Sequence, residues 1–308
     1  MNLRGWEARL AVLLLGLGLV ACGTSHASSS GPGSRPRIVV TYSVLGSVVK
    51  DVVGSAADVK VLMPNGANPH EWSASAKDVE SMQNADLVID NGLGLEANLQ
   101  DPLKEARSNG VRVFTIADHI TVRKVKAGEG ADATDPDQAA GADDPHLWMD
   151  PLTMKQWIGP FMSELQAMGI DATASGAKVE SGLDALSSEV SAIVGSIPVE
   201  RRKLVTGHES MGYFAERYRF QLIGAVIPSI TSQAETSAGE LAHLTDKIRK
   251  AHVPAMFAEI GTPRATVEAI ASDTGTNVIE LSTHNLPADG TYRSFMIDIA
   301  TTIAKALS

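Results

Sequence analysis

Short runs of β-branched residues alternate with segments of helical period along most of this chain, and this alternation limits the fold more than any other feature. The runs in the first half cover residues 37–43, 59–64, 86–92 and 111–116, and the helical segments between them cover 46–54, 75–84 and 97–108. Apolar strands joined by helices are typical of βα units, in which a parallel sheet is buried on both faces. The pattern therefore predicts an α/β fold.

The same alternation returns in the second half of the chain. Its strand-like runs cover residues 203–208, 220–227, 255–260 and 277–281, and its helical segments cover 211–218, 237–251, 263–274 and 292–307. The helix expected from residue 237 opens with Ser237 and has Glu240 three residues later, which is the pattern of a capping box. We therefore predict a second α/β unit in this half.

Residues 171–198 separate the two halves, have a helical period and contain no strand-like run. Such a segment can bridge two lobes. We therefore predict an N-terminal α/β lobe over residues 37–167, a linking helix over 168–200 and a C-terminal α/β lobe over 201–308.

The N-terminus has the pattern of an export signal. Arg4 and Arg9 precede the apolar run "LAVLLLGLGLVAC", whose length suits a secretory signal and is too short for a stable membrane-spanning helix. The run ends in "LVAC", which resembles the lipobox of bacterial lipoproteins, where the cysteine is acylated after cleavage. We expect a signal peptide over residues 1–21 and a lipid on Cys22 that anchors the protein outside the cytoplasm, at the cell surface or in the periplasm. Because Cys22 is the only cysteine, no disulfide framework is expected.

Two segments of the chain are too polar to build a core. Residues 22–36 are rich in Ser, Gly and Pro and predict a flexible tether, and residues 126–144 predict a mobile acidic loop. The formal net charge is −10, and removal of residues 1–21 would make it one unit more negative because two arginines and one glutamate are lost. This charge argues against a nucleic-acid partner and favours a cationic one.

Four of the eight histidines fall at the carboxyl ends of predicted strands or in the loops that follow them, namely His70, His146, His208 and His284. Open parallel sheets bind their ligands at this edge. Each half of the chain supplies two of the four, so a metal site built from them would lie in a cleft between the lobes. Taken singly, each histidine has a simpler explanation as a surface group or a hydrogen-bonding support.

Several neighbouring residues have both a structural and a functional interpretation. Glu71 and Glu209 each follow one of these histidines and could orient it, although an exposed glutamate is the commoner case. Asp150 and Pro151 are typical of the N-cap and first residue of a helix, which is a structural role. Trp148 is interpreted as a packing residue.

The segments "NPHEW", "DPHLWMDP", "GHESMGYFAERY" and "QAETSAGELAHL" occur in this order between residues 37 and 308. Together they resemble the solute-binding lipoproteins of bacterial ABC importers for zinc and manganese, of the zinc-uptake type. In that family, two four-stranded α/β lobes are joined by one long helix. The metal lies between the lobes on three histidines, or on two histidines and a glutamate, with an acidic residue or water in addition.

The resemblance implies a function and a set of ligands. His70, His146 and His208 match the family's ligand motifs, and the cargo would be Zn²⁺ or alternatively Mn²⁺. A monomer would capture the ion and deliver it to an ABC permease in the membrane, without enzymatic activity.

The chain departs from the family pattern at the last ligand. Many relatives have an aspartate in a segment like "ELYSDSL", where this chain has "ELSTHNL" with His284. Four imidazoles suit zinc, whereas manganese sites favour carboxylate oxygens. The alternative is that Glu259 or a water molecule completes the site, which would favour manganese. The loop 126–144 is histidine-rich in some zinc-binding relatives and acidic here, so its role stays open.

Two other functions remain as alternatives. A secreted zinc hydrolase needs an open coordination position for water and a nearby general base, for which Glu71, Glu209 or Glu259 could serve. Four protein ligands would leave no open position. The second alternative is a surface adhesin that retains the same fold.

Overall fold

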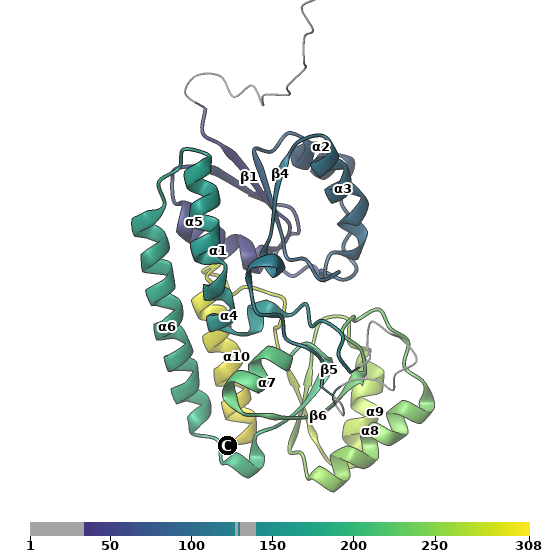
Figure 1. The fold of residues 1–308 in the computed structure, drawn as a ribbon. Helices are drawn as coiled ribbons and strands as arrows, with labels where there is room; N and C mark the ends of the chain where they lie inside the picture. Colours follow the sequence, from purple (N-terminus) through teal and green to yellow (C-terminus); the bar gives the residue numbers. More distant parts are fainter. Residues whose placement is uncertain (1–33, 127–128, 130–139) are drawn as a thin grey trace, which may run out of the picture.

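The computed structural model describes residues 34–126, 129 and 140–308 of the chain. The predicted signal peptide, Cys22, most of the tether and much of the loop 126–144 lie outside the described residues. The described chain forms two α/β lobes of parallel strands flanked by helices, one above the other in Figure 1. No helix among the described residues combines the length and the apolar character needed to cross a membrane.

The N-terminal lobe contains a four-stranded parallel sheet with the strand order β2-β1-β3-β4. Its two central strands are almost entirely buried and its two edge strands are partly exposed, as expected for a sheet covered on both faces. The strands are β1 (Arg37–Val40), β2 (Asp58–Val61), β3 (Leu87–Asp90) and β4 (Arg112–Thr115). The helices are α1 (Ser43–Val53), α2 (Ala76–Gln83), α3 (Gln100–Ser108), α4 (Pro151–Gln156) and α5 (Ile158–Ala167).

The C-terminal lobe repeats this arrangement with four more parallel strands. The strands are β5 (Lys203–His208), β6 (Gln221–Ile227), β7 (Ala255–Ala258) and β8 (Asn277–Glu280). The helices are α7 (Gly212–Tyr218), α8 (Ala238–Ala251), α9 (Arg264–Thr274) and α10 (Tyr292–Leu307). The α/β class and the two lobes expected from the sequence are confirmed.

The second sheet differs in one detail from the expected four-stranded ladder. The structure divides it into the parallel pairs β5-β6 and β7-β8. β5 and β7 lie side by side and are buried like central strands, but no ladder joins them in the described chain. Near their carboxyl ends, the backbone N–H of Gly207 donates to the side chain of Glu259 at 3.1 Å. A carboxylate therefore takes the place of a strand carbonyl at this point.

The longest helix in the described part of the chain is α6 (Thr173–Gly195), which runs along one side of both lobes (Figure 1). It packs against α1, α4 and α5 of the N-terminal lobe and against α10 of the C-terminal lobe. Its 23 residues span about 35 Å. The helix is shorter than the predicted 168–200 because Gly169 has a positive φ of 79° and Pro198 cannot continue a helix. The exact division of the chain into 37–167, 168–200 and 201–308 stays a prediction.

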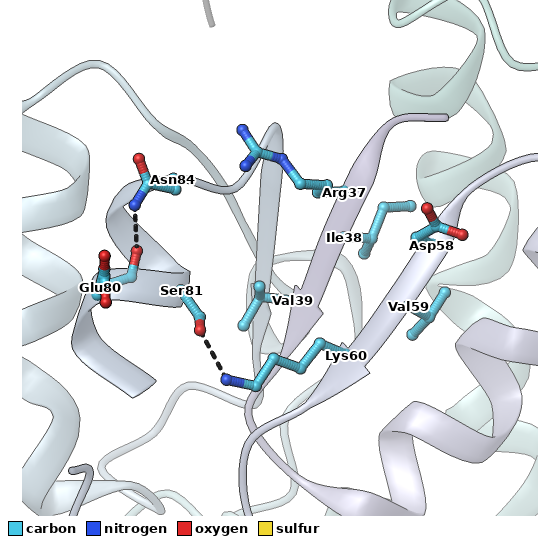
Figure 2. Close-up of a pocket in the computed structure, with 9 residues that line it drawn as sticks. All are labelled: Arg37, Ile38, Val39, Asp58, Val59, Lys60, Glu80, Ser81 and Asn84. Carbon is cyan, nitrogen blue, oxygen red and sulfur yellow. Dashed lines mark hydrogen bonds between the residues drawn. The ribbon is translucent and has the colours of Figure 1, made fainter. Parts of the chain in front are cut away.

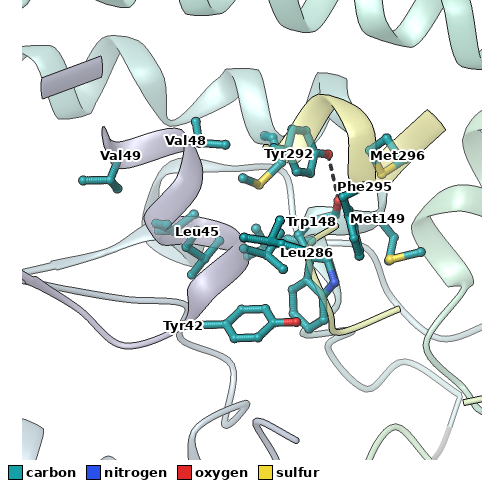
Figure 3. Packing of buried hydrophobic residues seen from close by; sticks show 14 of the residues in the cluster. Tyr42, Leu45, Val48, Val49, Trp148, Met149, Leu286, Tyr292, Phe295 and Met296 are labelled. Carbon is teal, nitrogen blue, oxygen red and sulfur yellow. Dashed lines mark hydrogen bonds between the residues drawn. The ribbon is translucent and has the colours of Figure 1, made fainter. Parts of the chain in front are cut away.

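One apolar cluster extends through both lobes. Figure 3 shows the seam, where Tyr42 and Leu45 of the N-terminal lobe pack near Trp148, Leu286 and Tyr292. The Tyr292 hydroxyl donates to the backbone oxygen of Trp148 at 2.8 Å, so this buried polar group of the seam is satisfied. Because a large apolar contact opposes separation, the lobes are expected to move little relative to each other.

Two helix caps read from the sequence are confirmed. The Asp150 side chain accepts hydrogen bonds from the backbone N–H groups of Leu152 and Thr153, and Pro151 is the first residue of α4. Ser237 and Glu240 form the expected capping box at the start of α8. These caps fix where the chain leaves the loops that carry candidate site residues.

Candidate metal centre

His70, His146, His208 and His284 converge at the contact between the two lobes. The N-terminal lobe supplies His70, in the loop after β2, and His146, directly before the short 3-10 helix Leu147–Met149 that precedes α4. The C-terminal lobe supplies His208 at the end of β5 and His284 in the loop after β8. One ligand atom from each residue lies within 4.8 Å of the others, and all four side chains are buried.

The spacing of the ring nitrogens suits one metal ion. The Nε2 atom of His146 lies 3.3 Å from that of His70 and 3.1 Å from that of His208. Nitrogens at the corners of a tetrahedral zinc site, each about 2.0–2.1 Å from the ion, are separated by roughly 3.3–3.4 Å. The Nε2 atom of His284 is buried and has no hydrogen-bond partner among the described residues. A buried nitrogen without a partner is costly, and a metal ion would satisfy it.

Asp144 lies directly behind His146. Its Oδ1 atom accepts from the ring Nδ1 of His146 at 2.9 Å and from the backbone N–H of the same residue at 3.0 Å. A carboxylate accepts only, so Nδ1 carries the ring proton and the lone pair of Nε2 faces the other three histidines. Asp144 belongs to the stretch predicted to be an acidic loop, yet it is buried, and sequence reasoning missed it. Its position two residues before His146 is the signal that could have identified it.

Glu259 holds the two histidines of the C-terminal lobe. Its Oε2 atom lies 3.1 Å from Nδ1 of His208, which is ion-pairing distance without hydrogen-bond alignment. The same oxygen accepts from the hydroxyls of Ser210 at 2.7 Å and Thr283 at 2.8 Å. Because the Thr283 hydroxyl donates to Glu259, it must accept from Nδ1 of His284 at 2.9 Å, which leaves Nε2 of His284 unprotonated. Glu259 thus lies behind the histidines, and the compact ligand group does not include it.

A polar contact between the lobes holds the loop of His70. Asn68 accepts from the backbone N–H of His70 at 3.2 Å and donates to the hydroxyl of Ser232 in the C-terminal lobe at 2.7 Å. The side chain of Gln233 donates to the backbone oxygen of His70. Glu71, which could have oriented a histidine, is exposed and accepts from Asn68. The loop of His70 is therefore fixed from both lobes.

Trp148 forms a wall of the site as well as packing in the core. Its ring lies 5.3 Å from the ring of His146 and 5.7 Å from that of His284, centre to centre. Its indole N–H donates to the backbone oxygen of Thr283 at 3.0 Å, which joins the loops of the two lobes. The interpretation as a packing residue was incomplete for this reason.

Burial sets the protonation states that metal binding requires. Burial and the neighbouring imidazoles lower the pKa of His70 and His284 well below the usual value. Burial also lowers the pKa of His146, although Asp144 opposes part of this effect. Burial would raise the pKa of Glu259, but His208 and the hydroxyl donors outweigh it and lower the pKa. Burial therefore favours the neutral imidazoles of His70, His146 and His284, and a neutral imidazole is the form that binds a dication.

The remaining described histidines lie outside this group. His119, His243 and His252 are exposed, and His119 stacks on Phe114. A separate cavity of about 340 Å³ lies beside β1, β2 and α2 (Figure 2). No histidine lines it, and the amine of Lys60 within it already donates to Ser81 at 2.6 Å. The histidine cluster is therefore the candidate site.

Comparisons of the sequence and of the fold with known proteins point to the same family. The profile of the ZnuA family, described as "Zinc-uptake complex component A periplasmic", matches residues 38–306. The zinc-binding protein TroA of Treponema pallidum is 29% identical over 269 residues, which cover 85% of this chain and 83% of TroA. The manganese-binding lipoprotein MntA of Halalkalibacterium halodurans is 24% identical over 293 residues, which cover 94% of this chain and 92% of MntA.

A solved structure of TroA from Treponema pallidum superposes with a TM-score of 0.76 at 27% identity. The match covers 89% of this chain and 100% of the TroA chain. The sequence match extends over nearly all described residues, and the fold agrees with it. The chain therefore belongs to the ZnuA family, the family of the periplasmic component A of a zinc-uptake complex.

Proposed function

We propose that this chain captures a divalent transition-metal ion outside the cytoplasm and delivers it to the permease of an ABC importer. The observation that carries the proposal is the convergence of four buried histidines, two from each lobe, with carboxylates held behind them. His70, His146, His208 and His284 would be the ligands. The ion is cargo, so a monomer would bind it reversibly and release it to the permease.

The donor set favours zinc over manganese. The named relatives include a zinc-binding and a manganese-binding protein, so family membership alone does not choose between the two ions. Zinc accepts four nitrogen ligands in a tetrahedron, whereas manganese favours oxygen ligands in a larger shell. Glu259, the main oxygen alternative, is already engaged by Gly207, Ser210 and Thr283. We therefore propose His284 as the fourth ligand.

The same ligand set argues against a hydrolase. A catalytic zinc site keeps one coordination position open for water, and four histidine ligands would fill a tetrahedral ion. We therefore propose a binding protein without catalytic activity. An adhesin with this fold would have the same metal site, so the metal site does not distinguish an adhesin from an importer component. The neighbouring genes can distinguish the two. A neighbouring permease and ATPase would support an importer.

The direct test is a zinc titration of the purified chain after its metal has been removed. We expect one tightly bound zinc ion per molecule and weaker binding of manganese. In a strain that lacks the gene, zinc uptake under metal limitation should return with the wild type and not with a His146→Ala, His208→Ala variant. A chain that binds no zinc, or uptake that does not depend on the gene, would contradict the proposal.

We also propose that Cys22 carries a lipid that anchors the chain to the outer face of the membrane. Cys22→Ala should move the protein from the membrane fraction to the soluble fraction or the medium, because one residue provides the acylation site. Quantitative blotting of the fractions would measure this. His26→Ala changes the same tether without removing the thiol and should stay in the membrane fraction. Retention of the Cys22→Ala variant in the membrane would rule out the anchor.

A further inference from the structure

Arg123 is a buried arginine that contacts three carboxylates at the contact between the lobes. Its side chain is only 7% exposed. One guanidinium nitrogen lies 3.0 Å from Oδ2 of Asp144, a second contacts Glu129, and the third lies 3.5 Å from Glu216 of α7. A buried guanidinium needs such partners, since an unpaired charge in this environment would be costly.

The pairing with Asp144 connects Arg123 to a proposed metal ligand. Asp144 uses Oδ2 for Arg123 and Oδ1 for the ring of His146. The backbone N–H of Asp144 also donates to the backbone oxygen of Arg123 at 3.0 Å. The arginine therefore fixes the rotation of the carboxylate, and the carboxylate fixes the direction in which Nε2 of His146 points.

The C-terminal lobe holds Arg123 from the other side. The backbone N–H of Arg123 donates to the hydroxyl of Tyr213 at 2.9 Å, and Glu216 lies against its side chain. Gly212, at the start of α7, packs directly on the pair. A Cβ atom there would lie 2.3 Å from both a guanidinium nitrogen of Arg123 and Asp144 Oδ2, so a larger residue would displace the pair.

We propose that Arg123 couples the contact between the two lobes to the strength with which His146 binds metal. It is a positioning residue, because it acts through Asp144 and does not touch the ion. When α7 is seated, Arg123 is held by Tyr213 and Glu216 and keeps Asp144 behind His146. A local loosening of α7, without separation of the lobes, would remove these partners from the arginine and the fixed orientation from the histidine, so metal would leave faster. The inference rests on the metal site proposed above.

The experiment measures zinc affinity, and the rate of zinc loss to a chelator, in the full chain. Partners of metal-ligating histidines usually contribute about 10–100-fold to affinity. We expect a loss of that order for Arg123→Met and a partial rescue by Arg123→Lys. Tyr213→Phe and Glu216→Gln should release zinc roughly threefold to tenfold faster, as weaker versions of the same effect. Arg112→Met is the matched control, since Arg112 pairs with Glu164 inside the N-terminal lobe and this pair involves neither α7 nor Asp144.

Combined variants separate positioning from a general loss of structure. In a His146→Ala background, Arg123→Met should cause no further loss of zinc affinity, and in an Arg123→Met background, Glu216→Gln should have no further effect, because its partner on Arg123 is already gone. Unchanged affinity in both Arg123 variants would overturn the inference, and so would an equal loss in the His146→Ala background. A wild-type chain that binds no zinc would instead contradict the proposed function itself.

Discussion

Replacing His284 by alanine is expected to lower the affinity for zinc by about two to three orders of magnitude. Structural zinc sites with four ligands bind with about 10–16 kcal/mol, so one ligand contributes roughly 2.5–4 kcal/mol. This corresponds to about 100-fold to 1,000-fold in the dissociation constant. Competition titration with a chromophoric chelator would measure it. His243→Ala removes an exposed histidine from α8 and should bind zinc like the wild type.

Glu259 provides the comparison that tests the identity of the fourth ligand. Glu259→Gln keeps the shape of the side chain but weakens its hold on His208 and Thr283, so a smaller loss of about 10–100-fold is expected. His284→Asp would replace a nitrogen ligand by a carboxylate and should raise the affinity for manganese relative to zinc. Unchanged zinc binding in His284→Ala, together with a severe loss in Glu259→Gln, would show that the carboxylate and not the imidazole is the ligand.

Zinc should also raise the melting temperature of the chain by roughly 10 °C. Only the folded state brings the four histidines together, so a free zinc concentration 1,000 times the dissociation constant would stabilise it by about 4 kcal/mol. For a domain of this size, each kcal/mol shifts the melting temperature by about 2–4 °C. Differential scanning calorimetry at several zinc concentrations would measure the shift.

The shift in melting temperature has two internal controls. It should grow with the logarithm of the free zinc concentration, and manganese at the same concentration should give a smaller shift because its affinity for nitrogen ligands is lower. In His146→Ala the shift should be reduced in proportion to the lost affinity. A melting temperature that does not respond to any divalent ion would argue that the histidine cluster is a structural feature of the core.

Much of the local structure could be predicted because the relevant signals are local. The buried strands β1, β3 and β7 each consist mainly of apolar residues, and a run of this kind at strand length predicts its own burial. The caps at Asp150 and Ser237 depend on residues at most three positions away. The four histidines could be selected because each lies after a strand or in a characteristic motif.

The sequence by itself therefore determined the α/β class, the approximate positions of the helices and strands, and the four histidines proposed as ligands. The tertiary structure decided how these parts pack together. It places β5 and β7 side by side without a ladder. It also makes Asp144 a buried partner of His146, where the sequence had predicted a solvated acidic loop. It also decided that Glu259 faces the rear of His208, and that Arg123 joins α7 to Asp144. The physical reason is that hydrophobic periodicity and capping act over a few residues. Hydrogen bonds to a buried imidazole depend on distances between segments far apart in the chain, which only the packed fold sets.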